Sequence, residues 1–449
     1  MKRRPRPALW FALVALGTSG ASACRRAEVR PPLVLISLDT TRADRLGCYG
    51  AARPTSPHLD RLANDAVVYT RAVSTSSWTL PAHASLFTGK LTSAHGAHYD
   101  PEGPLDLRGA IDGPEEWRHY RVRPLAPSEH TLAEILRDAG YRTSGVVVGP
   151  WLKQAFGLAQ GFEEWDEAGI ATANGRLAGS VTDAALRALD SGLDRPLFLF
   201  LHYFDPHGPY QAPEPYGHAF LAPGAPLAES PQGEELVARY DAEILYMDRE
   251  LGRFLDGLRA RGRYDRAIVV VTADHGELLG EHGRVGHGHH LTEPELRIPL
   301  IVKFPKGRVA PARDASRVQL TDVLPIVLNH LGLPLPAGIQ GGLPPSVGHP
   351  IVAEVYPPAA FSPEGDWRAL YDGRHKLLWS SQGRHALYDL ERDPGELANL
   401  AEREGARVER LGTLLSRFLD ALPRPGEAGP PRTLDAETAE ALRALGYVR

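Results

Sequence analysis

Three polar clusters along the chain carry residue types that bind metal ions and move protons. The first contains Asp39, the second His207, and the third Asp274 and His275. Each cluster directly follows a short run of apolar residues. Carboxylate and imidazole groups together suit a divalent ion such as Mn, Zn, Mg or Ca. One such cluster could be a helix cap, where Asp is common, but three of them favour a metal site.

A second chemical feature is Thr79, which begins the segment TLPAHASLFTGK. Pro81 fits the first turn of a helix and Gly89 fits its end, so the pattern predicts a helix with Thr79 at or just before its N-cap. In one interpretation Thr79 only caps this helix. In the other it is a nucleophile, because a helix N-terminus and a bound cation both stabilise an alkoxide. His83 comes one turn later and would face the same end of the helix.

Alternating strands and helices are predicted to position these residues. Ligands of a parallel sheet bind beyond the carboxyl ends of its strands, which is where the polar clusters begin. The expected fold class is α/β, with a large, mainly parallel sheet covered by helices on both faces. Its strands are expected in the unbroken apolar runs LVLISL (33–38), SGVVVG (144–149), LFLFLHYF (197–204), AIVVVTA (267–273) and IPLIVKF (298–304), with helices at 56–66, 131–140, 182–191 and 235–262.

The sequence changes character near residue 350. WRALYDGRHKLLWSSQGRHALYDL is typical of amphipathic strands joined by turns, and the later ANLAEREGARVERLGTLLSRFLDAL is typical of a helix. A small C-terminal antiparallel sheet with a packed helix is therefore expected. We predict a catalytic domain at 32–350, a small C-terminal subdomain at 351–422, and a linker with a terminal helix at 423–449.

Composition excludes several classes of protein. Hydrophobic residues make up 43% of the 449 residues and charged residues 23%, which is ordinary for a globular protein. The net charge is −5 and no long basic block occurs, so no nucleic-acid groove is expected. Cys24 and Cys48 are the only cysteines, which excludes a disulfide framework. Cys48 is expected to be a buried small residue.

The N-terminus, MKRRPRPALWFALVALGTSGASAC, has the order of a secretory signal. Its apolar run from Ala8 to Leu16 is too short to span a membrane as a helix. Small residues then precede Cys24, as in a bacterial lipobox. We expect a signal peptide at 1–23 and a lipidated linker at 24–31, in an exported, periplasmic or outer-membrane lipoprotein of a bacterium. Plain cleavage after the A-S-A stretch is the alternative.

Seven motifs together resemble the sulfatase family of the alkaline-phosphatase superfamily. They are LVLISLDTTRADRLGCYG, PTSPHLDRLA, TLPAHASLFTGK, DPHGPY, TADHGELLGEHG, RIPLIVKFP and LYDLERDPGELANL, in the family's order. Each motif alone is weak, but the set is highly specific and spans nearly the whole mature chain. The resemblance implies a large α/β domain with a small C-terminal domain, and an ester hydrolase that uses a metal ion.

The resemblance also implies roles for individual residues. Asp39 resembles the first metal carboxylate, and Thr40 stands where many members have a second Asp. Asp274 and His275 resemble the metal pair that follows a later strand, where many sulfatases have Asn in the second place. His207 resembles the imidazole that contacts the ester or protonates the leaving group.

Thr79 is the main departure from the family. Sulfatases have Cys or Ser at this place, oxidised to formylglycine, and the aldehyde hydrate lets an enzyme-bound sulfate leave by elimination. A threonine sulfate has no such exit, whereas water can attack a threonine phosphate in line at phosphorus. Relatives with an unmodified Thr or Ser nucleophile act on phosphorus, and Asp39, Thr79, Asp274 and His275 form the metal set expected of them. His83 stands where the family usually has the Arg that braces the nucleophile.

Further basic groups are candidates for contacting the ester. The family commonly supplies a Lys in the segment after the metal pair, but residues 276–302 contain none. His287 or His289 is a candidate replacement. Arg42 and Lys90 are candidates for reaching the site. A structural role is the alternative for each of these four residues.

The sequence thus favours a secreted, metal-dependent hydrolase or transferase that acts on phosphate or phosphodiester esters through Thr79. The first alternative is a true sulfuric ester hydrolase, acting without formylglycine or with a modified neighbour such as Ser77. The second is a non-catalytic binding lipoprotein, against which the coherent metal set argues. The expected cofactor is a divalent ion, Ca, Mn, Zn or Mg. The expected partner is an ester substrate, with no nucleic acid, and with membrane contact only through lipid on Cys24.

We predict that the mature protein begins at Cys24 and carries lipid there, because basic, apolar and small residues precede this cysteine in the order of a lipobox. Mass spectrometry of the membrane fraction of the native cell is expected to show the lipid mass on the N-terminal peptide. An unlipidated N-terminus, as plain cleavage would leave, would count against this prediction.

Overall fold

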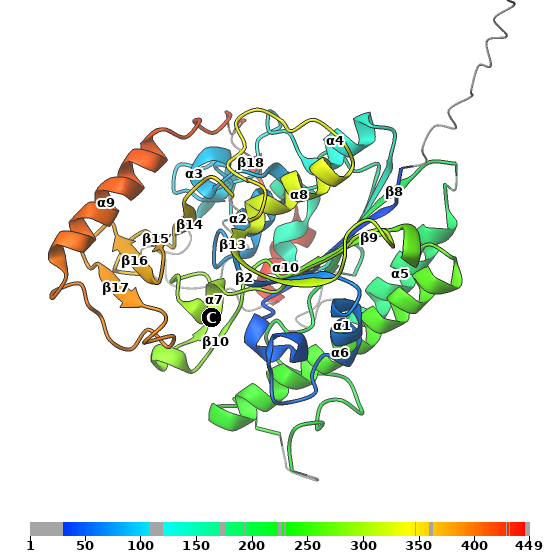
Figure 1. The fold of residues 1–449 in the computed structure, drawn as a ribbon, viewed down its shortest axis with the longest axis horizontal. Coiled ribbons are helices and arrows are strands. Elements are labelled where there is room, and N and C mark those ends of the chain that lie inside the picture. Colours follow the sequence, from blue (N-terminus) through cyan, green and yellow to red (C-terminus); the bar gives the residue numbers. More distant parts are fainter. Residues whose placement is uncertain are drawn as a thin grey trace, which may run out of the picture. The chain divides into compact units, whose positions relative to one another are not determined.

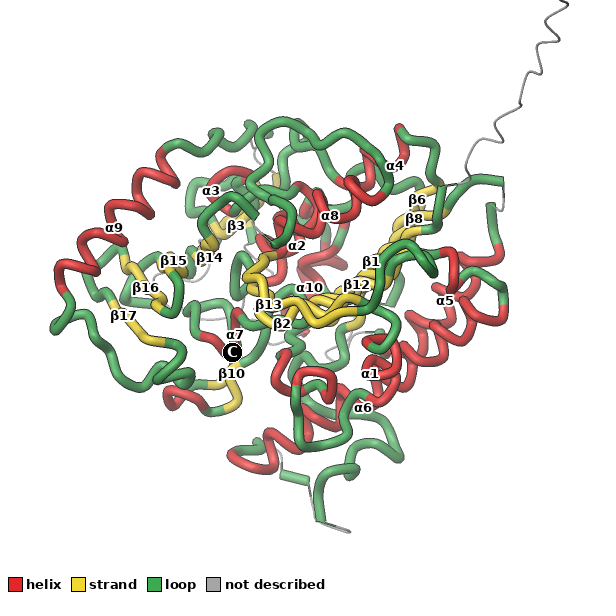
Figure 2. Tube along the Cα trace, in the orientation of Figure 1, coloured by secondary structure: helices red, strands yellow, loops and turns green. Residues whose placement is uncertain are grey.

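A sheet of eight strands crosses the middle of the protein in the computed structural model (Figures 1 and 2). In spatial order the strands are β13 (Ala312–Gln319), β2 (Val67–Val73), β12 (Leu300–Lys303), β9 (Ile268–Thr272), β1 (Leu33–Leu38), β8 (Leu197–Tyr203), β6 (Arg142–Val146) and β7 (Glu164–Asp166). All neighbouring pairs are parallel except those of β12, which runs antiparallel to β2 and β9.

The structure describes residues 30–107, 120–169, 176–192, 194–222, 227–228, 230–345, 347–358, 362–427, 429–430 and 432–444. The expected signal peptide and Cys24 lie outside the described residues, so the predicted export and lipidation stay predictions. Among the described helices, none combines the length and the apolar character needed to cross a bilayer.

Two layers of helices cover the two faces of the large sheet (Figure 1). Strand β1 shows why, because all six of its residues are buried and they alternate between two hydrophobic clusters. Leu33 and Leu35 belong to the cluster that includes α2 (Thr79–Thr88), α4 (Leu132–Asp138), α8 (Val323–His330) and α10 (Ala436–Ala444). Val34 and Ile36 belong to the cluster that includes α1 (Pro57–Ala63), α5 (Ala178–Asp190) and α6 (Gly233–Ala260).

The parallel strands β8, β1 and β9 end at the same edge of the sheet. Their register pairs Ser37 of β1 with His202 on one side and with Thr272 on the other. The three polar clusters found in the sequence follow these strand ends, so they meet at one place. The predicted fold class is confirmed, both by this sheet and by the small C-terminal sheet described next.

The C-terminal sheet is antiparallel and lies apart from the large one, beside α9 (Figure 1). Leu411 and Leu415 of α9 pack on one of its faces, and Leu296 of α7 packs against the other. The predicted division of the chain at 350 and 422 stays a prediction. The elements of this part are β14 (Ile351–Val355), β15 (Trp367–Asp372), β16 (His375–Ser380), β17 (Ala386–Asp389), α7 (Glu293–Leu296) and α9 (Gly405–Asp420).

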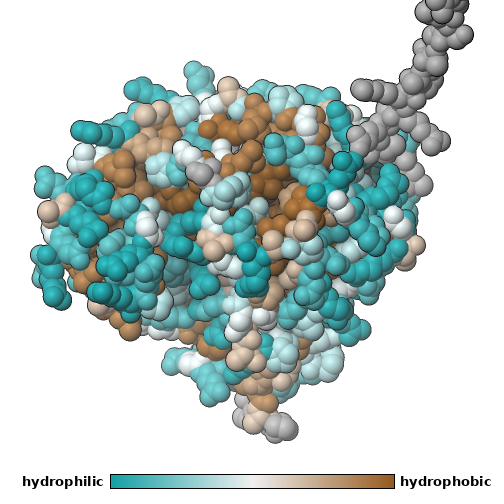
Figure 3. All heavy atoms as spheres, viewed as in Figure 1, coloured by the Kyte–Doolittle hydropathy of each residue, from teal (hydrophilic) through white to brown (hydrophobic). Residues whose placement is uncertain are grey.

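Short elements complete the described fold. They are the helix α3 (Thr92–His95), the two-stranded sheet of β10 (Leu278–Leu279) and β11 (Val285–Gly286), and the sheet of β18 (Arg432–Thr433), β4 (Leu105–Asp106), β5 (Arg121–Arg123) and β3 (His98–Tyr99). On the face drawn in Figure 3, hydrophobic side chains gather around α8 and β14, and polar side chains lie along the margins.

Strands β2 and β13 have no counterpart in the sequence prediction. Both carry charged residues in mid-strand, and Arg71 of β2 pairs in register with Arg317 of β13. Such strands lack the unbroken apolar run that marks a strand buried on both faces. They lie at one edge of the sheet, where the side chains reach solvent.

A buried lysine joins the C-terminal sheet to α7. Lys376 of β16 is fully buried, and its Nζ lies 3.0 Å from Oε1 of Glu293 and 2.8 Å from Oε1 of Glu396. Tyr371 donates its hydroxyl hydrogen to Glu293 at 2.7 Å. Two carboxylates therefore share one ammonium inside the protein, and each depends on it for its charge balance.

Replacing Lys376 by Ala is predicted to lower the free energy of unfolding by about 3–5 kcal/mol, because it leaves two buried carboxylates without their cation. Thermal and urea unfolding followed by circular dichroism would measure the change. Lys306→Ala is the matched control, since Lys306 is 79% exposed and pairs with Asp265 at 3.5 Å. It should change stability by less than about 1 kcal/mol. Equal effects of the two substitutions would contradict the prediction.

Candidate metal and nucleophile site

The predicted metal residues meet at the carboxyl ends of β1 and β9. Asp39 follows β1 directly, and Asp274 and His275 follow β9 after one residue. All three are fully buried, and their candidate ligand atoms lie within 4.8 Å of one another. The parallel register of β1 and β9 places the ends of the two strands side by side. The structure thus brings together the three strongest metal candidates of the sequence.

Thr40 turns the chain at this point in a left-handed conformation, with φ of 50°. This region is unfavourable for a β-branched residue, so its surroundings must hold it there. The Thr40 N–H donates to Oδ1 of Asp274 at 3.2 Å, and its carbonyl accepts a hydrogen bond from the Tyr240 hydroxyl at 2.6 Å. Its hydroxyl is buried without a hydrogen-bond partner among the described residues. The strained turn places Thr40 beside the carboxylates, and its predicted role as a metal ligand stays a prediction.

Thr79 is the first residue of α2, one position later than a capping residue would be. Trp78 is the N-cap and makes no side-chain capping bond, so the hydroxyl of Thr79 is not used to cap the helix. Its Oγ1 instead lies 3.3 Å from Nε2 of His275. This placement supports the nucleophile interpretation over the capping one. The helix ends at Thr88 and Gly89 takes the left-handed conformation, as the sequence predicts.

The hydrogen bonds of His275 define which of its nitrogens can bind a metal. Nδ1 lies 2.9 Å from the Gly276 carbonyl oxygen, which can only accept, so Nδ1 donates. In the neutral ring Nε2 then carries a lone pair, 3.3 Å from Oγ1 of Thr79 and 3.4 Å from Oδ2 of Asp274. Burial alone would lower the pKa of His275, but the charges of Asp274 and Asp39 raise it. A cation at this place would compete with that proton.

The buried oxygens of the carboxylates show that the site fits a cation. Both oxygens of Asp39 and Oδ2 of Asp274 are buried without a hydrogen-bond partner among the described residues. Burial raises the pKa of Asp39 to about 6, and burial together with the Asp39 charge raises the pKa of Asp274. Buried carboxylates without partners are costly, and a bound divalent ion removes that cost. Asp39, Asp274 and His275 are the residues that would hold it, with the hydroxyl of Thr79 beside them.

His202 is a member of the site that the sequence prediction did not include. It lies on β8, and its Nε2 is 3.1 Å from Oδ2 of Asp39, without hydrogen-bond geometry. Burial lowers the pKa of His202 to about 4, so the pair carries no His–Asp charge pairing at neutral pH. Together with His83 and Asp274, His202 forms a second group with metal-ligand spacing. The signal was a histidine inside an otherwise apolar strand.

His83 contacts the backbone of the nucleophile. Its Nδ1 donates to the Thr79 carbonyl at 2.9 Å, and its Nε2 lies 2.9 Å from the Ser37 hydroxyl. Burial lowers the pKa of His83 to about 4, so the ring is neutral and Nε2 accepts the Ser37 hydrogen. His83 therefore links the first turn of α2 to β1. This contact supports the bracing role predicted for it.

His207 and His287 extend the site away from the carboxylates. The His287 ring lies 4.4 Å from that of His275 and 5.1 Å from that of His207. Nδ1 of His287 lies 3.0 Å from Oε1 of Glu277, and Nδ1 of His207 lies 2.8 Å from the Gly208 carbonyl oxygen. Burial raises the pKa of Glu277 to about 7. Glu277 was not predicted as a site residue, although it lies only two residues after His275 in the motif TADHGELLGEHG.

Other predicted residues lie in different places. Lys90 comes after the end of α2, so ten helical residues separate it from the catalytic end, and its Nζ pairs with Glu129 at 2.6 Å. Arg42 bonds to Asp44 and Glu281, and it donates to the Glu277 carbonyl at 3.1 Å. This placement favours structural roles for Lys90 and Arg42.

His289 is half-buried, two residues beyond His287, and burial and Arg284 lower its pKa to about 4. Its predicted contact with the ester stays a prediction.

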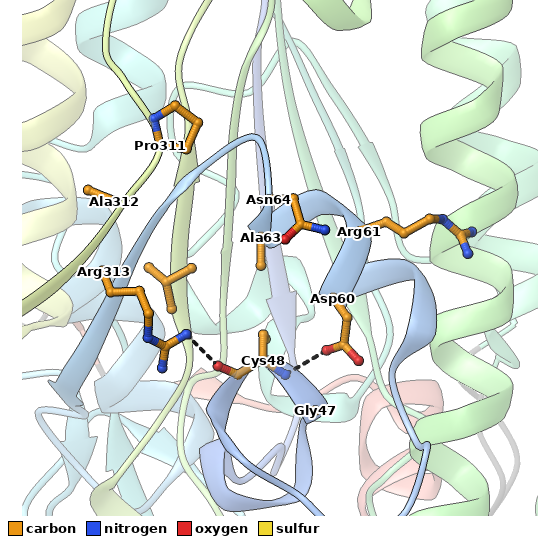
Figure 4. A pocket seen from close by; sticks show the side chains of 10 residues that line it. Gly47, Cys48, Asp60, Arg61, Ala63, Asn64, Pro311, Ala312 and Arg313 are labelled. Atoms are coloured by element: carbon orange, nitrogen blue, oxygen red, sulfur yellow. Dashed lines mark hydrogen bonds between the residues drawn. The ribbon is translucent and has the colours of Figure 1, made fainter.

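Cys48 lies in a separate hollow, shown in Figure 4, between the loop after β1 and the start of β13. Its N–H donates to Asp60 at 2.6 Å, and its carbonyl accepts from Arg313 at 2.8 Å. Burial and the Asp60 carboxylate raise the pKa of its thiol to about 12. Cys48 is half-buried and stays protonated at neutral pH, which agrees with the absence of a predicted catalytic role.

Comparison with known proteins places this geometry in context. Residues 31–333 match the model of the family described as Sulfatase. An ulvan-active sulfatase of Formosa agariphila is 26% identical over 421 residues, which cover 83% of this chain and 77% of that protein. The phosphonate monoester hydrolase of Agrobacterium radiobacter has a similar fold: it matches with a TM-score of 0.68 at 22% identity, and the match covers 87% of this chain and 96% of that chain.

A second solved structure of similar fold contains a bound sugar. It is a complex with the substrate D-glucosamine-2-N,6-O-disulfate, and it matches with a TM-score of 0.71 at 18% identity. The match covers 87% of this chain and 98% of that chain.

Metal content is predicted to depend on Asp274 and on pH. Asp274→Ala removes one of the three buried ligands, so purified protein should lose its bound divalent ion, as measured by inductively coupled plasma mass spectrometry. In the wild type, protons compete for Asp39, whose pKa in the metal-free site is raised to about 6. Affinity for the metal should therefore fall as the pH drops through about 6 and recover above it.

Asp265→Ala is the matched control, because Asp265 is exposed and lies outside the site. At every pH it should bind as much metal as the wild type does. Full metal occupancy in Asp274→Ala would show that the assignment is wrong.

Proposed function

Because this chain belongs to the sulfatase family and is an ester hydrolase of that family, we propose that it cleaves a phosphate monoester or phosphodiester with the hydroxyl of Thr79 as nucleophile. One observation carries the proposal. Oγ1 of Thr79 is buried, is not used for helix capping, and lies 3.3 Å from Nε2 of His275, a candidate metal ligand. A threonine cannot become the aldehyde that sulfatases form, so its hydroxyl must act directly.

The fate of the covalent intermediate favours phosphorus over sulfur. A formylglycine hydrate sheds bound sulfate by elimination, using its second hydroxyl group. Thr79 has a methyl group and a hydrogen on Cβ, so a sulfate on its oxygen has no such exit. A phosphate on the same oxygen can be removed by water, which attacks phosphorus and leaves the Cβ–O bond intact. The residue type at position 79 therefore selects the chemistry.

The chain's own residues supply most of the machinery for the two steps. A divalent ion held by Asp39, Asp274 and His275 would supply Lewis-acid polarisation of the ester and lower the pKa of the hydroxyl. Thr79 lies at the N-terminus of α2, whose dipole stabilises negative charge there. His83 holds the Thr79 carbonyl at 2.9 Å, so the backbone that carries the nucleophile cannot shift.

We assign proton transfer to His207, which lies beside His287 at the end of the site away from the carboxylates. In the first step the Thr79 oxygen loses its proton and bonds to phosphorus, the bond to the leaving oxygen breaks, and that oxygen gains a proton. His207 follows β8 and is buried beside His287, with Nδ1 2.8 Å from the Gly208 carbonyl oxygen, and we assign to its imidazole the transfer of the Thr79 proton to the leaving oxygen. In the second step water bonds to phosphorus, the Thr79 oxygen leaves, and the free hydroxyl is restored. If an alcohol replaced water in the second step, the phosphoryl group would pass to that alcohol and the enzyme would act as a transferase.

Sulfate ester hydrolysis is the second candidate function. The matched ulvan-active sulfatase favours it, and so does the solved relative with a disulfated glucosamine. In this alternative a neighbour such as Ser77 would take part. Ser77 is buried, and its hydroxyl has no hydrogen-bond partner among the described residues. Export and a lipid anchor on Cys24 remain part of our proposal on the strength of the N-terminal sequence alone.

Thr79→Ala is predicted to lower kcat/KM for the best phosphoester roughly 10³-fold or more, because it removes the nucleophile. Thr79→Ser keeps the hydroxyl and should retain part of the activity. The measurement is a panel of aryl phosphate, phosphodiester, phosphonate and sulfate esters with Mn, Zn, Ca or Mg. Rapid-quench mass spectrometry of the wild type should show a phosphoryl group on the peptide that contains Thr79.

Ser77→Ala serves as the control that separates the two candidates. It should leave phosphoester turnover nearly unchanged if Thr79 is the nucleophile. Faster turnover of aryl sulfates than of every phosphoester, together with loss of activity in Ser77→Ala, would overturn the proposal in favour of sulfate chemistry.

A further inference from the structure

A second hollow, of about 490 Å³, lies beside the C-terminal sheet. We call it the arginine pocket, because five arginines line it: Arg42, Arg71, Arg297, Arg317 and Arg374. Part of its wall comes from the large sheet and its loops. The rest comes from the C-terminal sheet and the loop 390–395. Neither Thr79 nor any of the three proposed metal ligands lines it.

Two of these arginines come from neighbouring strands at one edge of the large sheet, and a third lies beside them. Arg71 of β2 pairs in register with Arg317 of β13, so their side chains leave the same face of the sheet. Arg297 lies beside β2 as well, because it forms a bridge with Val73. Like charges on directly paired strands destabilise a sheet. The fold therefore holds Arg71 and Arg317 where their charges repel each other, with Arg297 beside β2.

The carboxylates around the pocket are already bound to other cations. Asp44 and Glu281 pair with Arg42 at 2.9 and 2.6 Å. Glu293 pairs with Lys376, as described above. Asp389 pairs with Arg374 at 3.2 Å. Glu391 also lines the pocket but is exposed.

The three arginines of the sheet edge have no such partners. Among the described residues, Arg71, Arg297 and Arg317 form no ion pair with a carboxylate within 4.0 Å, and only longer-range attraction links Arg297 to Asp44 and Arg317 to Glu293. Arg317 is held in position, because its guanidinium lies 4.5 Å from the centre of the Tyr371 ring and donates to the Gly373 carbonyl at 3.3 Å. Burial, and then the charge of Arg71, lower the pKa of Arg317. A fixed, half-buried guanidinium beside a like charge is suited to binding an anion.

We propose that the arginine pocket binds an oxyanion, namely a sulfate, phosphate or carboxylate group, between Arg71, Arg297 and Arg317. Guanidinium groups match the oxygens of such anions with paired hydrogen bonds. The anion would replace repulsion between Arg71 and Arg317 by attraction. The site goes beyond the proposed function, since it needs neither Thr79 nor the metal.

The oxyanion can be a free inorganic ion or an anionic group on a larger molecule. Arg42 connects the pocket to the catalytic loop, because its side chain lines the pocket and donates to the Glu277 carbonyl. Arg42 would therefore lie between an anion in the pocket and Glu277, whose side chain contacts His287. The experiment separates the two sources by comparing inorganic sulfate with a sulfated sugar.

The test measures the melting temperature of metal-loaded protein against sulfate and phosphate concentration, at constant ionic strength. The wild type should melt at a higher temperature as the anion is added. Arg71→Gln/Arg317→Gln should weaken the apparent affinity about tenfold or more, because charge-assisted hydrogen bonds are lost. Without anion the double variant should be at least as stable as the wild type, since a repulsive pair is gone. Arg297→Gln, which changes an exposed residue, should weaken binding in the same direction if the double variant does not fold.

Arg313→Gln is the matched control, because Arg313 is on the same strand β13 but lines the other hollow (Figure 4). It should bind anions as the wild type does. In the second arm, stabilisation by glucosamine 6-sulfate but not by glucosamine or inorganic sulfate would identify a group on a larger molecule, and stabilisation by inorganic sulfate would identify a free ion. Unchanged binding in the double variant, an equal loss in Arg313→Gln, or no stabilisation of the wild type by any of these anions would overturn the proposal. Anion binding is measured by melting temperature and does not depend on turnover. Loss of turnover in Thr79→Ala therefore tests the proposed function alone, and the melting experiment tests the arginine pocket alone.

Discussion

Two carboxylates buried side by side, Asp39 and Asp274, are the constraint on which the site depends. Each would repel the other, and neither has enough hydrogen bonds to compensate for lost water. Only a rigid support can hold them so close. Strands β1 and β9 supply it, because both are buried on two faces and paired in register. A cation that relieved this repulsion would lie beside Thr79, the nucleophile that we propose.

The nucleophile and its support follow from the same arrangement. Thr79 reaches His275 because α2 begins at the sheet edge, and His83 ties that first turn to Ser37 of β1. The neutral imidazole of His83 makes these two contacts at the place where the resemblance leads one to expect Arg. It braces the backbone without adding a permanent charge beside Thr79. The site is therefore less positive than a site with arginine would be.

Much of the fold and of the site was predictable from sequence because burial leaves a clear signal. Strand β1 was predicted with its observed bounds, since a run of only six mostly apolar residues, rich in Leu, Val and Ile, is typical of a strand covered on both faces. Asp39, Asp274 and His275 were predictable because they directly follow such runs. The direction of β12 was not, because an apolar run looks the same in either orientation. His202 escaped notice because it lies inside β8, where the pattern indicates core.

Proximity in sequence also misled in one case. Lys90 belongs to the same motif as Thr79, but a helix carries it to the opposite end, where it pairs with Glu129. Strands β2 and β13 were missed because charged residues interrupt them. Two of those charged residues, Arg71 and Arg317, line the arginine pocket. The charges that prevented prediction of the two strands are therefore the same charges that make this edge of the sheet basic.

The shared ammonium of Lys376 connects the C-terminal sheet, through α7, to the loop that follows Asp274 and His275. Glu293, which it binds, begins α7, and the α7 backbone carbonyls of Pro294 and Glu295 accept hydrogen bonds from Glu277 and Gly276 at 3.1 and 2.7 Å. A continuous mechanical linkage therefore runs from β16 to the loop that carries Asp274. Truncation of the chain before the small sheet would therefore also affect the large domain. It would remove the contacts that hold α7 in place, and with them the support of the loop that carries Asp274 and His275, the proposed metal ligands.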